Sequence, residues 1–179
     1  MDDQSDASGP EHDERIDHFG RLWTPWRMDY IRDPGRDGDG CPFCVGDEAF
    51  DQSRVLHRAE HSFVIMNAYP YNPGHVMVIP YEHTDDYTCL TAEVTHEMAR
   101  LTQRVIGVLR ATVAPHGVNV GMNLGTAAGA GIADHLHQHV VPRWGGDTNF
   151  MPVIGQTRIL PELMHNTYEL LKPAFDEPE

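Results

Sequence analysis

The chain has 179 residues and a hydrophobic content of 40%, which is enough for one compact domain with a proper core. Its formal net charge of −14 argues against binding of duplex nucleic acid, which requires lysine and arginine to displace counterions from the phosphate backbone. The three cysteines do not form a disulfide framework, and we find no signal-like segment and no stretch of the roughly 20 apolar residues that cross a membrane. We therefore expect a soluble cytoplasmic protein that binds neither nucleic acid nor a membrane.

The first 20 residues are acidic and poor in large apolar side chains. Because they cannot bury enough surface to offset their ordering entropy, we expect them to be disordered. Residues 22–31 are instead dense in aromatic side chains, and such a patch must be covered by the chain's own domain or by a partner subunit. We expect a single domain over residues 21–172 and a tail over residues 173–179.

Residues 41–44 read Cys-Pro-Phe-Cys, a tight knuckle whose two sulfur atoms can share one metal ion. Cys41 and Cys44 would supply half of a tetrahedral zinc site. Since a sheet brings strand ends together, the other half is expected from His83, just after a strand, and from one histidine of the row at residues 135–139. The alternatives are a redox pair, which usually accompanies a βαβ pattern that is absent here, and two buried thiols.

The middle of the chain predicts short strands joined by turns, followed by one long helix. The turn at residues 70–74 and the short spacing favour antiparallel hairpins. In the helix, Thr91 is a plausible N-cap, Glu93 is favourably placed in the first turn, and an apolar stripe repeats with helical spacing. The expected strands are 54–57, 61–66, 75–80, 118–124 and 135–143, and the expected helices are 91–114 and 161–171. The sum is an α+β domain, with a mainly antiparallel five-stranded sheet, one long helix packed on it and a C-terminal helix.

A loop nearly free of bulky side chains precedes the last strand and reads Asn-Leu-Gly-Thr-Ala-Ala-Gly-Ala-Gly over residues 123–131. Small residues let backbone N–H groups approach an anion, although a flexible connector would look similar. The loop fits neither the Walker A pattern nor a dinucleotide fingerprint. The candidate nucleotide-binding positions in it are Asn123, Gly125, Thr126, Gly129 and Gly131.

Residues 135–141 read His-Leu-His-Gln-His-Val-Val, with three histidines at alternate positions. An extended strand would place His135, His137 and His139 along one face. Imidazole is nucleophilic, exchanges protons near neutral pH and binds metals, so a row of three beside the loop indicates phosphorus chemistry. A catalytic metal site is the alternative, but three consecutive alternates crowd poorly around one ion and no carboxylate is close in the motif. We favour one histidine as a metal ligand and the others as catalysts.

These motifs resemble the histidine-triad (HIT) superfamily of nucleotide hydrolases and transferases, whose signature is His-x-His-x-His-x-x with apolar x. The similarity runs over residues 22–171 and includes the Cys-Pro-Phe-Cys knuckle, Asn67, Pro-Gly-His-Val at 73–76 and the run 135–143. Residues 21–25 and 144–152 are most similar to the branch that contains a small diadenosine tetraphosphate phosphorylase.

The resemblance implies a homodimer, a structural zinc ion and roles for individual residues. His137 would be the nucleophile that attacks the α-phosphorus, and His139 would contact the phosphate and the leaving group. Asn67 corresponds to a ribose-binding position, and His75 lies close to the phosphates. The zinc ligands would be Cys41, Cys44, His83 and His135, and Mg²⁺ is a further candidate that would accompany the substrate.

The expected function is transfer of a nucleoside monophosphate from a dinucleoside polyphosphate, such as diadenosine tetraphosphate, through a nucleotidyl-histidine intermediate. Gln138 departs from the apolar pattern but should point to the opposite face. Gly131 lies where many hydrolytic members carry a phosphate-holding glutamine, which favours inorganic phosphate over water as the acceptor. The alternatives are a dinucleoside polyphosphate hydrolase, a nucleoside phosphoramidase and a non-catalytic nucleotide-binding scaffold.

Overall fold

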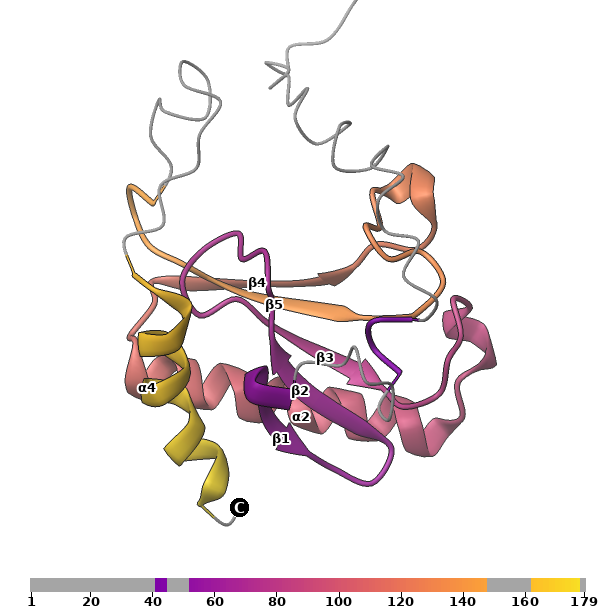
Figure 1. Ribbon diagram of the computed structural model, residues 1–179, viewed down its shortest axis with the longest axis horizontal. Helices are drawn as coiled ribbons and strands as arrows, with labels where there is room; N and C mark the ends of the chain where they lie inside the picture. Colours follow the sequence, from indigo (N-terminus) through magenta and orange to yellow (C-terminus); the bar gives the residue numbers. More distant parts are fainter. Residues whose placement is uncertain (1–40, 45–51, 148–161, 178–179) are drawn as a thin grey trace, which may run out of the picture.

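In the computed structural model, five strands form one antiparallel sheet in the order β1-β2-β3-β5-β4, flanked by helices α2 and α4 (Figure 1). The structure describes residues 41–44, 52–147 and 162–177, so the acidic N-terminus and the aromatic segment 22–31 lie outside the described residues. The strands are β1 Val55–Arg58, β2 Ser62–Met66, β3 Val76–Pro80, β4 Gly117–Met122 and β5 Gln138–Arg143, and the helices are α2 Ala92–Thr112 and α4 Met164–Asp176. The predicted α+β fold with an antiparallel five-stranded sheet is confirmed.

The strand order places the histidine motif inside the sheet. Strands β1, β2 and β3 follow one another as antiparallel neighbours, and β5 then pairs with β3 on one side and with β4 on the other. In this register His139 lies opposite Met77 of β3 and opposite Gly121 of β4. Because β3 and β5 are antiparallel, the segment that leads into β3 and the segment that leads into β5 lie at opposite ends of this strand pair.

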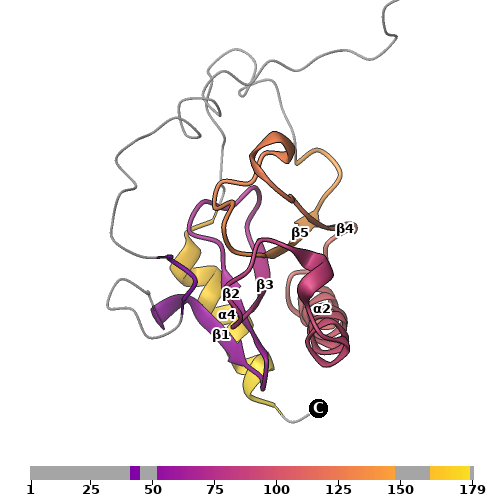
Figure 2. The same cartoon turned by 90° about the vertical axis from the view of Figure 1, so that its right-hand side faces the viewer.

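Alternating side chains of the central strands build two apolar layers, one on each face of the sheet. Val64 and Met66 of β2 face the layer that includes α2 and α4, whereas Phe63 and Ile65 face a second layer that includes Phe43. Helix α2 packs on β2, β3 and β5, and α4 packs on β1 and α2 (Figure 2). The second layer therefore connects the Cys-Pro-Phe-Cys knuckle to the face opposite α2.

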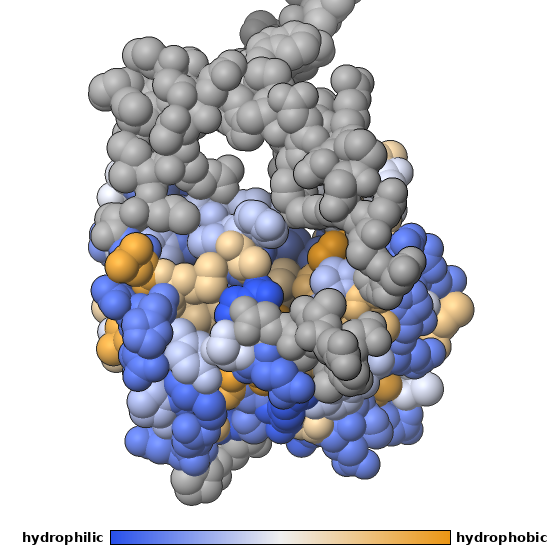
Figure 3. Space-filling view, in the orientation of Figure 1, coloured by the Kyte–Doolittle hydropathy of each residue, from blue (hydrophilic) through white to orange (hydrophobic). Residues whose placement is uncertain are grey.

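Helix α2 begins where the sequence predicts it. The side chain of Thr91 accepts a hydrogen bond from the backbone N–H of Val94 at 3.4 Å, which satisfies one of the unpaired donors of the first turn. The predicted apolar stripe is buried against the sheet; it comprises Val94, Met98, Leu101, Val105, Val108 and Leu109. No helix in the described part of the chain is long and apolar enough to cross a membrane. Where described residues are visible in Figure 3, the surface is mostly hydrophilic with scattered apolar side chains.

Helix α4 and strand β5 differ most from the sequence prediction. Helix α4 continues through Pro173 to Asp176, where the guanidinium group of Arg104 donates to the backbone carbonyls of Phe175 and Glu177 at 3.0 and 2.8 Å and so caps the helix. Strand β5 begins at Gln138 rather than at residue 135. The backbone N–H of Leu136 donates to Thr84 O at 2.8 Å instead of joining a ladder, so the prediction of a strand through all three histidines is wrong.

Candidate active site and metal cluster

Three imidazoles lie in a contiguous row at the junction of β3 and β5. The Nε2 atom of His75, which directly precedes β3, lies 3.0 Å from Nδ1 of His139 in β5. The ring of His139 lies 4.9 Å from that of His137, centroid to centroid, and the two planes are nearly perpendicular. His135, in contrast, turns to the two cysteines. The motif therefore divides into His135, which lies beside the sulfur atoms, and the adjacent pair His137 and His139, of which His139 contacts His75.

The imidazole of His137 is held by a backbone carbonyl two residues earlier. Its Nδ1 lies 2.8 Å from the oxygen of His135. Because a carbonyl only accepts hydrogen bonds, Nδ1 carries the proton, and the lone pair of the neutral ring is then on Nε2. The side chain is buried, and this burial lowers the pKa of His137, while the bond to the carbonyl partly offsets the shift. A neutral imidazole with an available Nε2 lone pair can act as a nucleophile near pH 7.

A backbone amide fixes the proton positions in the other two rings. The N–H of Tyr71 points to Nδ1 of His75 at 3.0 Å, so that nitrogen is an acceptor and the neutral ring carries its proton on Nε2. This Nε2–H donates to Nδ1 of His139, which places the proton of a neutral His139 on its own Nε2. His139 thus offers an N–H donor beside His137, an arrangement that can bind a phosphate oxygen or protonate a leaving group.

Asn67, the candidate ribose-binding residue, directly follows β2 and lies next to His75. Its Nδ2 lies 3.4 Å from the ring nitrogens of His75, and its Oδ1 accepts from the N–H of Tyr69 at 2.9 Å. The backbone N–H of Asn67 also donates to His75 O at 3.0 Å, which closes the loop between β2 and β3. The sequence-predicted Asn67 and His75 are therefore direct neighbours.

Two residues that the sequence analysis missed tie this loop to the end of β5. The amide nitrogen of Asn72 donates to Pro142 O at 3.0 Å and to a carboxylate oxygen of Asp147 at 2.7 Å. Asp147 also accepts from Nε and Nη2 of Arg143 at 2.6 and 2.9 Å, and this carboxylate raises the pKa of Arg143. We call these contacts of Asp147 with Asn72 and Arg143 the clamp. The only sequence signal for it is the Trp-Gly-Gly-Asp run at residues 144–147, and the spacing of that run does not predict a role for Asp147.

The glycine-rich loop between β4 and β5 makes a short 3-10 turn over Thr126–Ala128. Gly125 and Gly129 have φ values of +77° and +86°, which side chains rarely allow, so glycine is required at both positions. Several of its amides bond within the loop: the N–H groups of Ala128 and Ala130 donate to Gly125 O, and that of Gly129 donates to Thr126 O. The flanking candidates are Asn123, which is half-buried, and Gly131, which is exposed.

The four predicted metal ligands come together from three separate segments. The Sγ atom of Cys41 lies 3.2 Å from Nδ1 of His135, and that of Cys44 lies 3.3 Å from Nδ1 of His83. All four ligand atoms lie within 4.8 Å of one another. A tetrahedral zinc site with these ligands would set neighbouring ligand atoms roughly 3.3–3.8 Å apart, so the donor set fits the ion. Nε2 of His135 bonds to Pro80 O at 2.9 Å, which leaves Nδ1 as the ligating atom.

Gln138 lies away from the histidine row, as the sequence predicts. Its amide donates to Oγ1 of Thr102 in α2 at 2.5 Å, so this side chain joins the sheet to the helix. The departure from the apolar pattern at this position therefore does not bring a polar group to the histidine row.

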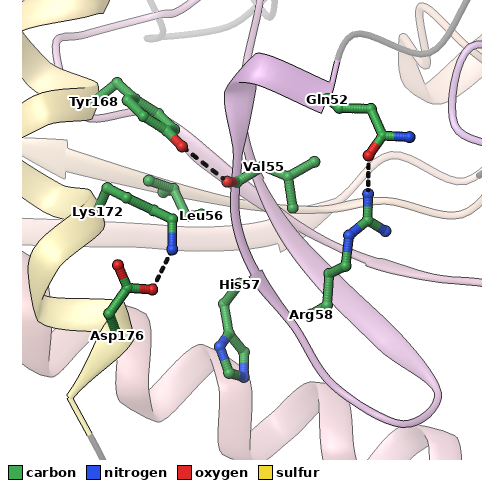
Figure 4. Close-up of a pocket in the computed structure, with 8 residues that line it drawn as sticks. All are labelled: Gln52, Val55, Leu56, His57, Arg58, Tyr168, Lys172 and Asp176. Carbon is green, nitrogen blue, oxygen red and sulfur yellow. Dashed lines mark hydrogen bonds and ion pairs between the residues drawn. The ribbon is translucent and has the colours of Figure 1, made fainter.

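A cavity of about 360 Å³ lies elsewhere, between β1 and α4 (Figure 4). Most of its polar side chains already have partners: Lys172 pairs with Asp176, and Tyr168 donates to Val55 O at 3.3 Å. Arg58 likewise donates to Gln52 at 3.0 Å. The cavity shares no lining residue with the histidine row or with the cysteine cluster.

Comparison with known proteins gives a consistent set of relatives. The family model described as the HIT domain matches residues 49–146. The AP-4-A phosphorylase of Mycobacterium tuberculosis strain H37Rv is 43% identical over 163 residues, which cover 87% of this chain and 84% of that protein.

Two solved structures of histidine triad proteins are also similar to this chain. A Zn-bound histidine triad family protein from Mycobacterium smegmatis superposes with a TM-score of 0.62 at 30% identity, covering 76% of this chain and 93% of that one. A hypothetical histidine triad nucleotide-binding protein from Sulfolobus tokodaii strain7 gives a TM-score of 0.59 at 27% identity, over 75% of this chain and 89% of the other.

Proposed function

The chain is an enzyme of the HIT domain family, and we propose that it transfers a nucleoside monophosphate group from a dinucleoside polyphosphate to inorganic phosphate through His137. The observation that carries this proposal is the 2.8 Å contact between His137 Nδ1 and His135 O, which leaves Nε2 to attack phosphorus. The 43% identity to a protein named AP-4-A phosphorylase supports both the substrate class and the acceptor.

The first step forms a bond between Nε2 of His137 and the α-phosphorus and breaks the bond from that phosphorus to the bridging oxygen. For diadenosine tetraphosphate the leaving group is ATP, and the proposed donor to it is the Nε2–H of His139, a tautomer supported by the contact of its Nδ1 with His75. The carbonyl of His135 stabilises the positive charge that the phosphorylated ring acquires, because Nδ1 keeps its proton.

In the second step an oxygen of inorganic phosphate attacks the same phosphorus and breaks the phosphorus–nitrogen bond. The products are ADP and a regenerated neutral His137. Inorganic phosphate is favoured over water as the acceptor because Gly131 has no side chain where, by the resemblance, many hydrolytic members carry a phosphate-holding glutamine. A phosphate ion held at this loop would gain the proximity advantage of a positioned reactant.

We further propose that Cys41, Cys44, His83 and His135 hold one structural zinc ion. Two sulfur and two nitrogen donors complete a closed tetrahedral set with no position left for substrate, so the ion would act on folding rather than on phosphorus. The zinc-bound relative from M. smegmatis supports the choice of metal.

A homodimer is the third part of the proposal. Strand β4 is at one edge of the sheet, and its side chains are mostly exposed, including Val120 at 46%. An exposed edge strand is a template for pairing with a second copy, which would cover Val120 and Gly121. Light scattering at micromolar concentration should then give twice the 20.1 kDa chain mass, and a clean monomer would contradict the dimer.

The function is tested by incubating the protein with diadenosine tetraphosphate in the presence and absence of inorganic phosphate. Formation of ADP plus ATP only with phosphate supports the phosphorylase. Equal formation of AMP plus ATP in both tubes makes the protein a hydrolase, whereas binding without turnover of any polyphosphate or phosphoramidate favours a scaffold.

The nucleophile is tested separately with His137→Asn, whose amide can still donate to His135 O. This variant should fold, bind nucleotide and form no covalent nucleotidyl adduct detectable by mass spectrometry of the intact protein. Retention of most of the activity would show that another group attacks the phosphorus.

A further inference from the structure

Phe43 belongs to the cysteine knuckle and also contacts the proposed nucleophile. It lies between Cys41 and Cys44 in the sequence, and its backbone N–H donates to Sγ of Cys41 at 3.4 Å. The side chain is only 7% exposed. Its ring centroid lies 5.2 Å from that of His137 and 5.7 Å from that of His135. One aromatic ring therefore contacts a proposed metal ligand and the catalytic imidazole at once.

A second connection joins the same two sites through the backbone. The Nδ1 atom of His135 faces Cys41, while the carbonyl of the same residue accepts the hydrogen bond from His137. Any shift of His135 that follows loss of the metal would move that carbonyl as well. The cysteine cluster is therefore joined to His137 by one hydrogen bond and by one packed ring.

The hydrogen bond between His137 Nδ1 and His135 O does not by itself fix the orientation of the His137 imidazole. A ring held at a single nitrogen can still swing about the Nδ1–H···O axis, and such a swing moves Nε2 away from the line of attack on phosphorus. Packing against Phe43 and against His139 limits this swing. Because misplacement by about 1 Å can reduce a rate roughly a hundredfold, even partial loss of the packing should be measurable.

We infer that Phe43 is a positioning residue for His137 and that, through it and His135, the metal cluster sets the orientation of the nucleophile. This inference rests on the proposed function for the identity of the nucleophile. It gives the cluster a role in the rate of the first chemical step, in addition to its contribution to folding.

The chain offers a matched control in Phe63, a fully buried phenylalanine of the same apolar layer. Its ring stacks on Tyr81 at 5.4 Å, and it belongs to β2 rather than to the knuckle. Phe43→Leu and Phe63→Leu remove the same atoms from the same layer. A merely structural role for Phe43 predicts similar behaviour of the two variants.

The experiment compares both variants with the parent protein after elemental analysis has shown equal metal content. In single-turnover reactions with diadenosine tetraphosphate, Phe43→Leu should form the nucleotidyl-His137 adduct about tenfold more slowly, and Phe63→Leu should do so within twofold of the parent. The defect should appear in kcat with little change in KM. Equal rates for the two variants would overturn the inference.

A second readout needs no catalysis. The Nδ1 proton of His137, observed by NMR in uniformly ¹⁵N-labelled protein, should exchange with solvent faster in Phe43→Leu and after chelation, but not in Phe63→Leu. Unchanged exchange in Phe43→Leu contradicts the inference, whatever the nucleophile proves to be. If Phe43→Leu does not fold, the same comparison is made with Phe43→Met and Phe63→Met. Adduct formation in His137→Asn would instead refute the proposed function and leave the exchange result standing.

Discussion

The Nε2 atom of His75 lies 3.0 Å from Nδ1 of His139, although the two residues are 64 positions apart in the chain. This contact exists because β3 and β5 are antiparallel neighbours, with Met77 opposite His139. The backbone N–H of Tyr71 sets the proton of His75, and His75 in turn sets the proton of His139. The N–H that we propose as the donor to the leaving group is thus specified by the loop between β2 and β3.

Replacing His75 by phenylalanine should therefore reduce kcat without unfolding the protein. The substitution keeps an aromatic ring at a fully buried position but removes the N–H that donates to His139. We expect kcat to fall about tenfold to a hundredfold, below the full effect of losing a general acid. His57→Phe is the control, because His57 stacks on Phe175 at 6.2 Å and is not part of the row formed by His75, His137 and His139. Steady-state kinetics that give equal kcat values for His75→Phe and the parent would contradict this assignment.

A second prediction concerns the clamp between Asp147 and Asn72. Asp147→Asn removes the charge that four donor nitrogens share, and we expect the free energy of unfolding to fall by about 1–2 kcal/mol. The Asp147 side chain is only 12% exposed, so solvent screens the interaction little on that side. The effect is measured by urea denaturation.

The control for the clamp is Asp176→Asn, which breaks an exposed ion pair with Lys172 on helix α4. Exposed pairs of this kind contribute little, so this variant should change the free energy of unfolding by less than about 0.5 kcal/mol. Equal losses in the two variants would show that the buried clamp does not stabilise the loop that carries Tyr71 and His75.

The sequence alone was sufficient where function depends on short spacing. The Cys-x-x-Cys knuckle and the alternating histidines predicted which side chains would gather, because metal ligands and catalytic groups leave a local pattern. The orientation of His135 required the structure, since alternation assumes a strand that in fact starts at Gln138. Asn72 and Asp147 were missed because their contact spans 75 positions between two turns, where no periodicity exists.

A third prediction concerns the reactivity of the three cysteines. In metal-loaded protein Cys41 and Cys44 should be protected, so a thiol reagent should titrate one group per chain, the exposed Cys89. A strong chelator should raise the count to three and lower the melting temperature, because a structural metal contributes directly to folding. Three reactive thiols before chelation in protein purified without chelator would contradict metal binding.

Cys89 provides an internal check on that titration. Its thiol donates to the carboxylate of Asp86 at 3.3 Å, and this hydrogen bond, together with the negative charge, raises the pKa of Cys89. Because the thiolate is the reactive form, Cys89 should react slowly at pH 8 and faster in Asp86→Asn. Cys89→Ser should leave no reactive thiol in the metal-loaded protein.

The last prediction concerns the acid side of the stability profile. Burial lowers the pKa of His137 below the ordinary value of 6.5, so the unfolded chain takes up a proton on this residue at a higher pH than the folded chain does. As the pH falls below 6.5 the unfolded state binds more protons, and the free energy of unfolding must decrease until the folded-state pKa is reached. The stabilising contribution of neutral His137 is thus fully present above pH 6.5 and is lost on the acid side.

The variant His137→Asn tests this pH dependence. It has no group at this position that titrates in this range, so its free energy of unfolding should change less between about pH 7 and about pH 5 than that of the parent protein. An NMR titration of the parent should place the midpoint for the Cε1 proton of His137 below 6.5. A midpoint at or above that value, or parallel stability profiles for parent and variant, would show that His137 is not held neutral by burial.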